Sequence, residues 1–499
     1  MSHLDVLLAA AAADTRQAQL RRVVRQRRIA DDPIVLVPFQ PGGEAHTLAA
    51  LGWGDDPNDL HQLVIAQPLN RTQLFQGLEP FIEWFTPRFE AAWDQAEWDD
   101  ETGRFLVDPT LLPQVLTANP ASIAALGRMG RRLSYLPTET SDDPDAPDPV
   151  PAELVRFGRS LRWLAGQATA SGQSLILDLV TLSQFHWVTV QSIGERAHLG
   201  ALDAWIDPPA GIDPDDAADL AERLSIGPYA VPSQEHAIAD TITAIGETER
   251  AGEPTDELAQ QLHDLWRARI EPVWERCWRS IDRLRSLEAD TVYLPSRVQH
   301  DADSYGRQLL WLDGETGGRA RTRDTPRQAI WAKKMAEYSQ GVLEAQETVT
   351  DPLAMVDEIL VGRAITGRVV GVDLDHKELR PGNKNATSVP VVTLQCGRRC
   401  LVPIGRKLWW TEDCGRVCAV LTAVEHDEDA SALVTLKLDK GIRDGGDRLA
   451  ALAAVGGTAC FSTYTTTQFF PSKLPPGDPF THTEPTLIVE HLEDAGEVA

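Results

Sequence analysis

Hydrophobic residues recur at helical spacing over most of the first 350 positions, and the pattern becomes strand-like afterwards. The clearest helical stretch covers residues 262–284, where apolar residues follow one another every three or four positions. They are Leu262, Trp266, Ile270, Val273, Cys277, Ile281 and Leu284. Because this spacing places them on one face of a helix, we expect that face to lie in the core. Cys277 is then a buried small hydrophobe rather than a reactive thiol.

Several other segments show the same period. Helical patterns cover 78–98 and 117–136, and a long helix is expected after Thr325 and Pro326, an N-cap residue followed by proline at the first helical position. Asp351 and Pro352 repeat that signature for a shorter helix. In this first part of the chain one short strand is expected, between Pro33 and Pro38.

A helix is also predicted over residues 4–29, where helix breakers are few. Helical spacing would place Arg21, Arg25 and Arg28 on one face of it, which makes this the clearest positive stripe of the chain. Three interpretations stay open. The stripe packs against the protein's own acidic surface, contacts nucleic acid or an acidic partner, or lies on a membrane surface.

The best linker in the sequence is PTETSDDPDAPDPVP, residues 137–151, which combines five prolines with a cluster of acids. It predicts a division into an α-helical N-terminal domain, residues 1–136, and an α-helical central domain, residues 152–350, that ends in a stalk-like helix.

After Gly362 the sequence contains six short β-rich runs with turn residues between them. They are AITGRVVGVD, VPVVTLQ, CLVPIG, RVCAVLTAVE, ALVTLKLD and TACFSTYTT. They predict a small closed β-barrel of the OB or SH3-like kind over residues 351–466, followed by a proline-rich and acidic tail, residues 467–499. The predicted fold class is therefore α+β and multidomain.

Composition limits the function classes. A chain of 499 residues is too long for one ordinary core, and 42% hydrophobic with 24% charged residues is typical of a folded protein. A net charge of −27 argues against wholesale coating of nucleic acid, because phosphate affinity comes from Lys and Arg, but it allows a local basic groove. Six cysteines do not form a secreted disulfide framework, the N-terminal apolar run has no positive charge before it, and no run of about 18 apolar residues occurs. We expect a cytoplasmic protein without a membrane span.

Strong catalytic signatures are missing from the sequence. It contains no G-x-x-x-x-G-K-[ST] loop, no G-x-G-x-x-G opening a helix, no G-x-S-x-G elbow and no H-E-x-x-H. The nearest constellation is His236, the pair His263–Asp264, and Asp301 or Asp324, which resembles the metal-dependent HD phosphohydrolases. In that interpretation the imidazoles and carboxylates would hold a divalent ion that activates water.

Four of the six cysteines lie close together, in two C-G-R-x-C repeats: Cys396 and Cys400, then Cys414 and Cys418. Four thiolates can hold zinc tetrahedrally. The spacing within each pair is Cys-x3-Cys, whereas the usual zinc knuckle is Cys-x2-Cys. Three interpretations remain: a zinc site, turns and strand positions of a metal-free barrel with reduced thiols, and redox pairing.

Basic and aromatic residues lie between these cysteines: Arg398, Arg399, Arg406, Lys407, Trp409 and Trp410. OB-type barrels bind single strands through such a mixture, with arginines on phosphates and aromatic rings under bases. The alternative is that one tryptophan belongs to the core and the arginines pair with nearby acids.

A basic helical stretch precedes the predicted barrel, which begins GRAITGRVVGVD. Its basic residues are Arg319, Arg321, Arg323, Arg327, Lys333 and Lys334. In order and character, residues 320–465 resemble the stalk-and-barrel accessory region of Upf1-like helicases, which lies beside the motor and touches nucleic acid. The motor itself has no counterpart in this sequence, so the resemblance implies a shape and not an activity.

These patterns together predict a non-enzymatic accessory or adaptor subunit of a larger assembly that handles nucleic acid, such as a bacterial antiviral defence system. The barrel and the N-terminal arginines would be its contact surfaces, and a separately encoded helicase or nuclease would be its partner. One alternative is a protein-interaction scaffold without nucleic-acid contact. A second is the metal-dependent phosphohydrolase that uses the His and Asp residues of the central region. Apart from zinc, no cofactor is expected.

Overall fold

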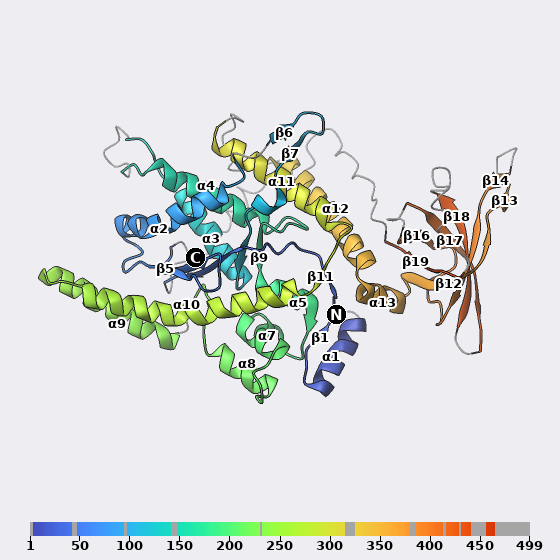
Figure 1. The fold of residues 1–499 in the computed structure, drawn as a ribbon, viewed down its shortest axis with the longest axis horizontal. Coiled ribbons are helices and arrows are strands. Elements are labelled where there is room, and N and C mark those ends of the chain that lie inside the picture. The colour runs from blue at the N-terminus through green and yellow to red at the C-terminus, as the bar shows by residue number, and fades with distance from the viewer. Residues whose placement is uncertain are drawn as a thin grey trace, which may run out of the picture.

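The computed structural model describes residues 3–41, 47–93, 97–140, 148–229, 232–314, 325–379, 386–412, 416–428, 431–440 and 456–464. They form a mixed α/β body, a long helix along one side of it that leads away, and a small β domain at one end of the molecule (Figure 1). The predicted tail, 467–499, lies outside the described residues. Within these ranges, no helix combines the length and apolar character needed to cross a membrane.

A five-stranded mixed sheet lies at the centre of the body. Its strand order is β5 (His61–Val64), β4 (Ala50–Gly54), β3 (Ile34–Phe39), β8 (Val115–Thr117) and β9 (Ile176–Asp178). Strands β3, β8 and β9 are parallel, whereas β4 and β5 add an antiparallel edge. The strand expected near Pro33–Pro38 is confirmed as β3, and all six of its residues are buried because helices cover both faces.

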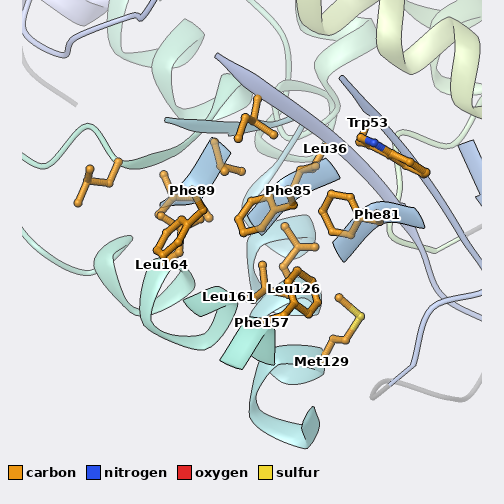
Figure 2. Close-up of a cluster of buried hydrophobic side chains, with 14 of the residues drawn as sticks. Leu36, Trp53, Phe81, Phe85, Phe89, Leu126, Met129, Phe157, Leu161 and Leu164 are labelled. Atoms are coloured by element: carbon orange, nitrogen blue, oxygen red, sulfur yellow. The ribbon is translucent and has the colours of Figure 1, made fainter. Parts of the chain in front are cut away.

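One face of the sheet is covered by α2 (Arg71–Phe89), α3 (Pro120–Leu133), α4 (Ala152–Gln167) and α11 (Leu294–Leu312). Their shared core is rich in aromatic rings (Figure 2). Phe81, Phe85 and Phe157 meet with centroid distances of 5.4 to 5.6 Å, and Phe157 stands edge-on to the other two rings. Such edge-to-face contacts suit the aromatic quadrupole and add to the burial of apolar area.

The opposite face is covered by α10 (Asp256–Arg285), with α5 (Leu179–His186) and α9 (Pro232–Ala251) beside it. The predicted apolar face of α10 is confirmed, since every residue named for it is buried, Cys277 included. Helix and sheet approach closely at Gly52 of β4, where a Cβ atom would lie 2.3 Å from Cγ2 of Ile270. A larger residue at this position would push α10 away from the sheet.

Smaller elements complete the body: α1 (His3–Thr15), β1 (Gln19–Leu20), β2 (Val24–Arg25), β6 (Glu97–Asp99), β7 (Arg104–Leu106), η2 (Pro109–Leu111), β10 (Trp187–Val188), α6 (Ile193–Arg196), α7 (Leu199–Ile206), α8 (Pro214–Glu222) and β11 (Glu288–Ala289). Strand β1 pairs with β10, β2 pairs with β11, and β6 pairs with β7.

The predicted division at residues 137–151 is wrong. Strand β8 precedes this segment and β9 follows it, yet the two strands are hydrogen-bonded neighbours in one sheet. Helices α3 and α4, also on either side of it, pack so closely that a Cβ atom on Gly130 would lie 2.6 Å from the Arg162 nitrogen. The regions predicted as two α-helical domains therefore form one α/β unit.

The helix predicted over residues 4–29 is also wrong in its second half. Helix α1 ends at Thr15, and Arg16 takes a left-handed φ of 56°. The chain then continues in an extended form through β1 and β2. A residue with positive φ cannot continue a right-handed helix, so Arg21, Arg25 and Arg28 do not share a helical face.

The long helix along one side of the body is α12 (Pro326–Thr350), and α13 (Pro352–Leu360) connects it to the β domain (Figure 1). Both predicted N-termini are confirmed. Thr325 forms a capping box with Gln328, and Asp351 caps α13.

The β domain is a closed six-stranded barrel with the order β12 (Ala364–Asp373), β15 (Val391–Cys396), β18 (Ala432–Lys440), β17 (Cys418–His426), β16 (Lys407–Trp410) and β19 (Thr458–Ser462). Pairing of β19 with β12 closes the barrel, and a small hairpin of β13 (Lys377–Glu378) and β14 (Thr387–Ser388) extends from it. Five of the six predicted β-rich runs contain these barrel strands. The run CLVPIG instead belongs to the connection between β15 and β16, and β16 begins after it.

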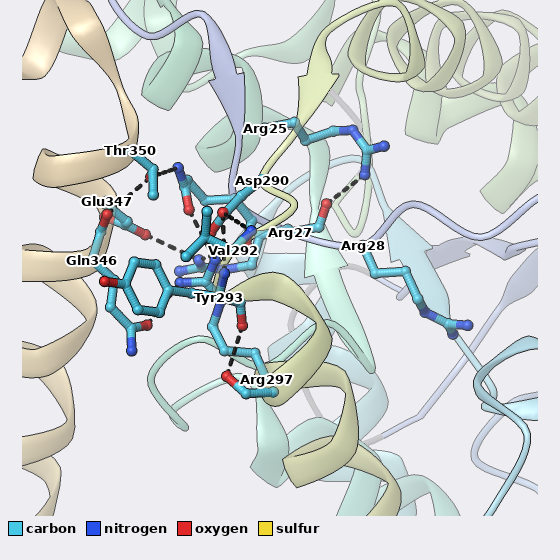
Figure 3. Close-up of polar contacts among 12 residues, drawn as sticks. Arg25, Arg27, Arg28, Asp290, Val292, Tyr293, Arg297, Gln346, Glu347 and Thr350 are labelled. Carbon is cyan, nitrogen blue, oxygen red and sulfur yellow. Dashed lines mark hydrogen bonds and ion pairs between the residues drawn. The ribbon is translucent and has the colours of Figure 1, made fainter. Parts of the chain in front are cut away.

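The N-terminal segment, the body and α12 meet in a buried polar cluster (Figure 3). Arg27 pairs with Glu347 of α12 at 3.0 Å, and Arg297 of α11 pairs with Asp290 at 2.6 Å. Gln26 links the two sides of this junction, since it donates to Thr350 and accepts from Arg297. Each charge has an opposite partner, which offsets the cost of burying it.

Asp351 joins the same parts through backbone groups. Its Oδ2 accepts from the N–H groups of Val23 and Val24 at 2.8 and 2.9 Å. Its Oδ1 accepts from Leu353 and Ala354 in the first turn of α13. One buried carboxylate thus holds the N-terminal segment to the start of the helix that leads into the barrel.

We expect Asp351→Ala to lower the free energy of unfolding by about 2–4 kcal/mol, because it removes an N-cap and leaves two partly buried N–H groups without an acceptor. Chemical denaturation measures this change. Asp100→Ala, at an exposed turn position, is the matched control and is expected to stay within about 0.5 kcal/mol of the wild type. Equal stability of the two variants would contradict the role given to Asp351.

Candidate nucleic-acid interface

The candidate interface is the connection between β15 and β16, residues 397–406, together with the outward face of β16. A Cβ atom on Gly362 would lie 2.8 Å from the Leu401 carbonyl oxygen, so the connection passes close to the end of α13. Val402 is buried in the barrel core, which anchors the middle of the connection. Its neighbours Leu401 and Ile404 are 55% and 64% exposed.

Four cations of this region are exposed: Arg398, Arg399, Arg406 and Lys407. The exposed Lys407 lies 3.7 Å from the partly buried Asp439, which is a long contact for an ion pair. The three arginines form no ion pair with any residue of the described ranges. Because exposed ion pairs are weak, all four cations remain able to bind an external anion.

Successive side chains of β16 point to opposite faces of the strand, so Trp409 and Trp410, which were both predicted to bind nucleic acid, lie on different faces. Leu408 and Trp410 point into the barrel core, and the Trp410 indole nitrogen donates to Glu412 at 2.5 Å. Trp409 is half-buried on the outer face, on the same side of the strand as Lys407. The prediction of Trp410 as a binding residue is therefore corrected, and Trp409 is the aromatic ring that lies beside the cations.

The cysteines do not form one cluster. Cys396 pairs in register with Ala432, the first residue of β18, whereas Cys418 pairs with Lys440, the last residue of that strand. Burial raises the pKa of Cys396 to about 11 and raises that of Cys400, which disfavours the thiolates that zinc requires. Cys414 lies outside the described residues. Within the described ranges, no group of three or more Cys, His, Asp or Glu side chains could hold a metal.

The N-terminal arginines bind the protein's own groups. Arg21 pairs with Asp5 at 2.9 Å, Arg25 donates to the Arg27 carbonyl at 2.6 Å, and Arg28 donates to the carbonyls of Pro109 and Leu112. Burial lowers the pKa of both Arg25 and Arg28. Of the three interpretations of this stripe, the structure agrees with packing against the protein itself.

The His and Asp candidates for a hydrolase lie on different parts of the body. The His263 carbonyl accepts from Gln62 of β5, whereas Asp301 accepts from the backbone of Ser174, just before β9. Strands β5 and β9 are the opposite edges of the five-stranded sheet, so these groups are roughly 19 Å apart across it. Asp264 is bonded to Gln260, His236 lies on the separate helix α9, and Asp324 falls outside the described residues. The prediction that these residues meet at one metal is wrong for the described ones.

Comparison of the chain with protein-family models, with curated proteins and with solved structures found no match. The assignment of a function to the candidate interface therefore depends on its geometry and chemistry.

We expect the purified protein to contain well below one zinc ion per chain, because Cys396 of β15 and Cys418 of β17 pair with opposite ends of β18. Elemental analysis by mass spectrometry measures this ratio after dialysis without chelator. One zinc per chain that is lost in Cys396→Ser would contradict the metal-free interpretation.

The buried Asp301 is expected to make the free energy of unfolding depend on pH. Burial raises its pKa from 3.8 to about 7, although Arg28, Arg27 and Arg297 act in the opposite direction. The folded protein therefore binds this proton more tightly than the unfolded chain, and stability falls as the pH rises from 3.8 to 7. In Asp301→Asn this part of the pH dependence is expected to disappear, as measured by denaturant unfolding at each pH. An unchanged slope would show that Asp301 does not titrate in this range.

Proposed function

We propose that the chain is a non-enzymatic accessory subunit that contacts single-stranded nucleic acid through the barrel, while any catalysis belongs to a partner such as a helicase or nuclease. The observation that carries the proposal is the group of exposed cations Arg398, Arg399, Arg406 and Lys407 within and just after one connection. They contrast with the net charge of −27 of the whole chain. A local positive surface on an acidic protein directs a polyanion to one place.

The arrangement of the barrel supports this proposal. Trp409 lies beside Lys407 on the outer face of β16, where an aromatic ring can stack under a base while the cation meets a phosphate. Stacking accepts any base and phosphate contacts carry no sequence information, so the expected binding is salt-dependent and only weakly sequence-selective. We assign the barrel to the OB or SH3-like class because it is small, antiparallel and closed.

The position of the barrel fits an accessory role. It follows α12 and α13 at one end of the molecule, and Asp351 fixes the start of α13 to the body (Figure 1). In this arrangement the body would dock on a partner while the barrel contacts the strand. A bacterial defence system is one setting for such a subunit.

A protein-interaction scaffold is the second candidate, and one observation favours it. Leu401 and Ile404 are exposed by 55% and 64% among the cations. Neighbouring exposed aliphatic side chains are typical of protein interfaces, whereas strand binding uses aromatic rings. An acidic protein surface with an apolar centre would fit the same connection.

Replacement of Arg398, Arg399, Arg406 and Lys407 by alanine is expected to weaken binding of a labelled single-stranded oligonucleotide at least tenfold at low salt. Four phosphate contacts give a slope of roughly −3 when the logarithm of the binding constant is plotted against the logarithm of the salt concentration. The variant should lose most of this salt dependence. Fluorescence anisotropy at a series of salt concentrations measures both quantities.

The matched control removes four exposed arginines of the body instead: Arg131, Arg223, Arg279 and Arg307. It changes the net charge equally and is expected to leave binding within about twofold of wild type. If wild type shows no salt-dependent binding to any oligonucleotide, alone or with a purified partner, the proposal fails. In that case, loss of partner binding in Leu401→Ser with Ile404→Ser would support the scaffold.

A further inference from the structure

A cavity of about 340 Å³ lies along the edge strand β9, between the body and α12. Its walls come from β9, α5, Ile123 of α3, the segment after α4, the N-terminal segment and α12, which contributes Gln340, Leu343 and Glu347. One end of the cavity, at Asp178 and the start of α5, lies at the carboxyl end of β9, and ligands of open α/β sheets bind on that side of the sheet.

His186 supplies a hydrogen-bond acceptor to this cavity. Its Nδ1 lies 3.1 Å from the Arg22 carbonyl oxygen, and because a carbonyl only accepts, Nδ1 carries the proton and Nε2 the lone pair. The ring is 1% exposed, and burial lowers its pKa to about 4, so it is neutral near pH 7. Nε2 has no hydrogen-bond partner within the described ranges.

Asp178 supplies a second acceptor, at the last position of β9. Its Oδ1 accepts from the Thr181 N–H at 2.7 Å and so caps α5, which fixes the carboxylate at the cavity wall. Burial raises the pKa of Asp178. A carboxylate at the end of a parallel strand is the group that binds ribose hydroxyls in dinucleotide-binding folds.

The remaining walls determine which ligands fit. Ile123, Leu182, Phe185 and Leu343 give the cavity an apolar side against which a flat ring can pack. Among the lining residues, the carboxylates of Asp178 and Glu347 outnumber the guanidinium of Arg27, which is already paired with Glu347. A phosphate group would meet a negative wall without a free cation there, so an uncharged donor-rich ligand is favoured.

We infer that this cavity binds a nucleoside, with amino or ring N–H groups of the base donating to Nε2 of His186 and a ribose hydroxyl donating to Asp178. Because α12 forms one wall, a bound nucleoside would add contacts between the body and the helix that leads to the barrel. The inference is independent of the proposed nucleic-acid contact, since the cavity and the β15–β16 connection share no residue.

The test measures binding of adenosine, guanosine, cytidine and uridine to the whole chain by calorimetry and by the shift of the unfolding temperature at millimolar ligand. At least one nucleoside is expected to bind and to raise the unfolding temperature. Its 5′-monophosphate is expected to bind at least tenfold more weakly. Absence of binding by all four nucleosides, or equal binding of the monophosphate, would overturn the inference.

Two variants locate the site. His186→Ala should weaken binding about tenfold through loss of one buried acceptor. Gln340→Trp, at an exposed position of α12 on the cavity wall, should block entry without disturbing the core. His426→Ala and Leu379→Trp, both at exposed positions of the β domain outside the candidate interface, are the controls and should bind as wild type does. Unchanged binding in Gln340→Trp, with its fold verified by circular dichroism, would place the ligand elsewhere and contradict the inference.

Discussion

The buried carboxylate of Asp351 is the interaction on which the arrangement of this protein depends. It accepts two N–H groups from the N-terminal segment and two from the first turn of α13. The ion pair of Arg27 with Glu347 and that of Arg297 with Asp290 hold α12 and α11 beside it. Because each of these charges is paired or hydrogen-bonded and most are buried, the contacts favour one position of the helix that leads to the barrel on the body.

Internal pairing of charged side chains also explains why the β15–β16 connection is a better candidate for a binding surface than the arginines of the body. Several arginines of the body are involved in internal contacts, such as Arg28 with backbone carbonyls and Arg283 with Asp203. An arginine whose donors are satisfied inside the protein offers little to a phosphate. Arg398, Arg399 and Arg406 differ because they are exposed and have no such partner in the described ranges.

Sequence patterns predicted the parts of the fold that repeat over many residues. The apolar face of α10 spans six turns, and β12 covers the run AITGRVVGVD. The central sheet escaped prediction because β8 and β9 have three residues each and are buried on both faces, so no alternation marks them. The end of α1 depends on the left-handed backbone of Arg16, which no residue type signals.

The candidate site was predictable in part for similar reasons. Clustering in sequence was enough to find the cations of the connection. Which tryptophan lies in the core depends on which residues of β16 face inward, and the structure shows that Trp410 does and Trp409 does not. The cavity beside His186 could not be predicted, because its walls come from segments that lie far apart in the sequence, from Gln26 to Glu347. The central claim is tested most directly by photo-crosslinking a single-stranded oligonucleotide to the protein and mapping the attached peptides. The account predicts adducts within residues 397–409, and adducts confined to the α/β body would contradict it.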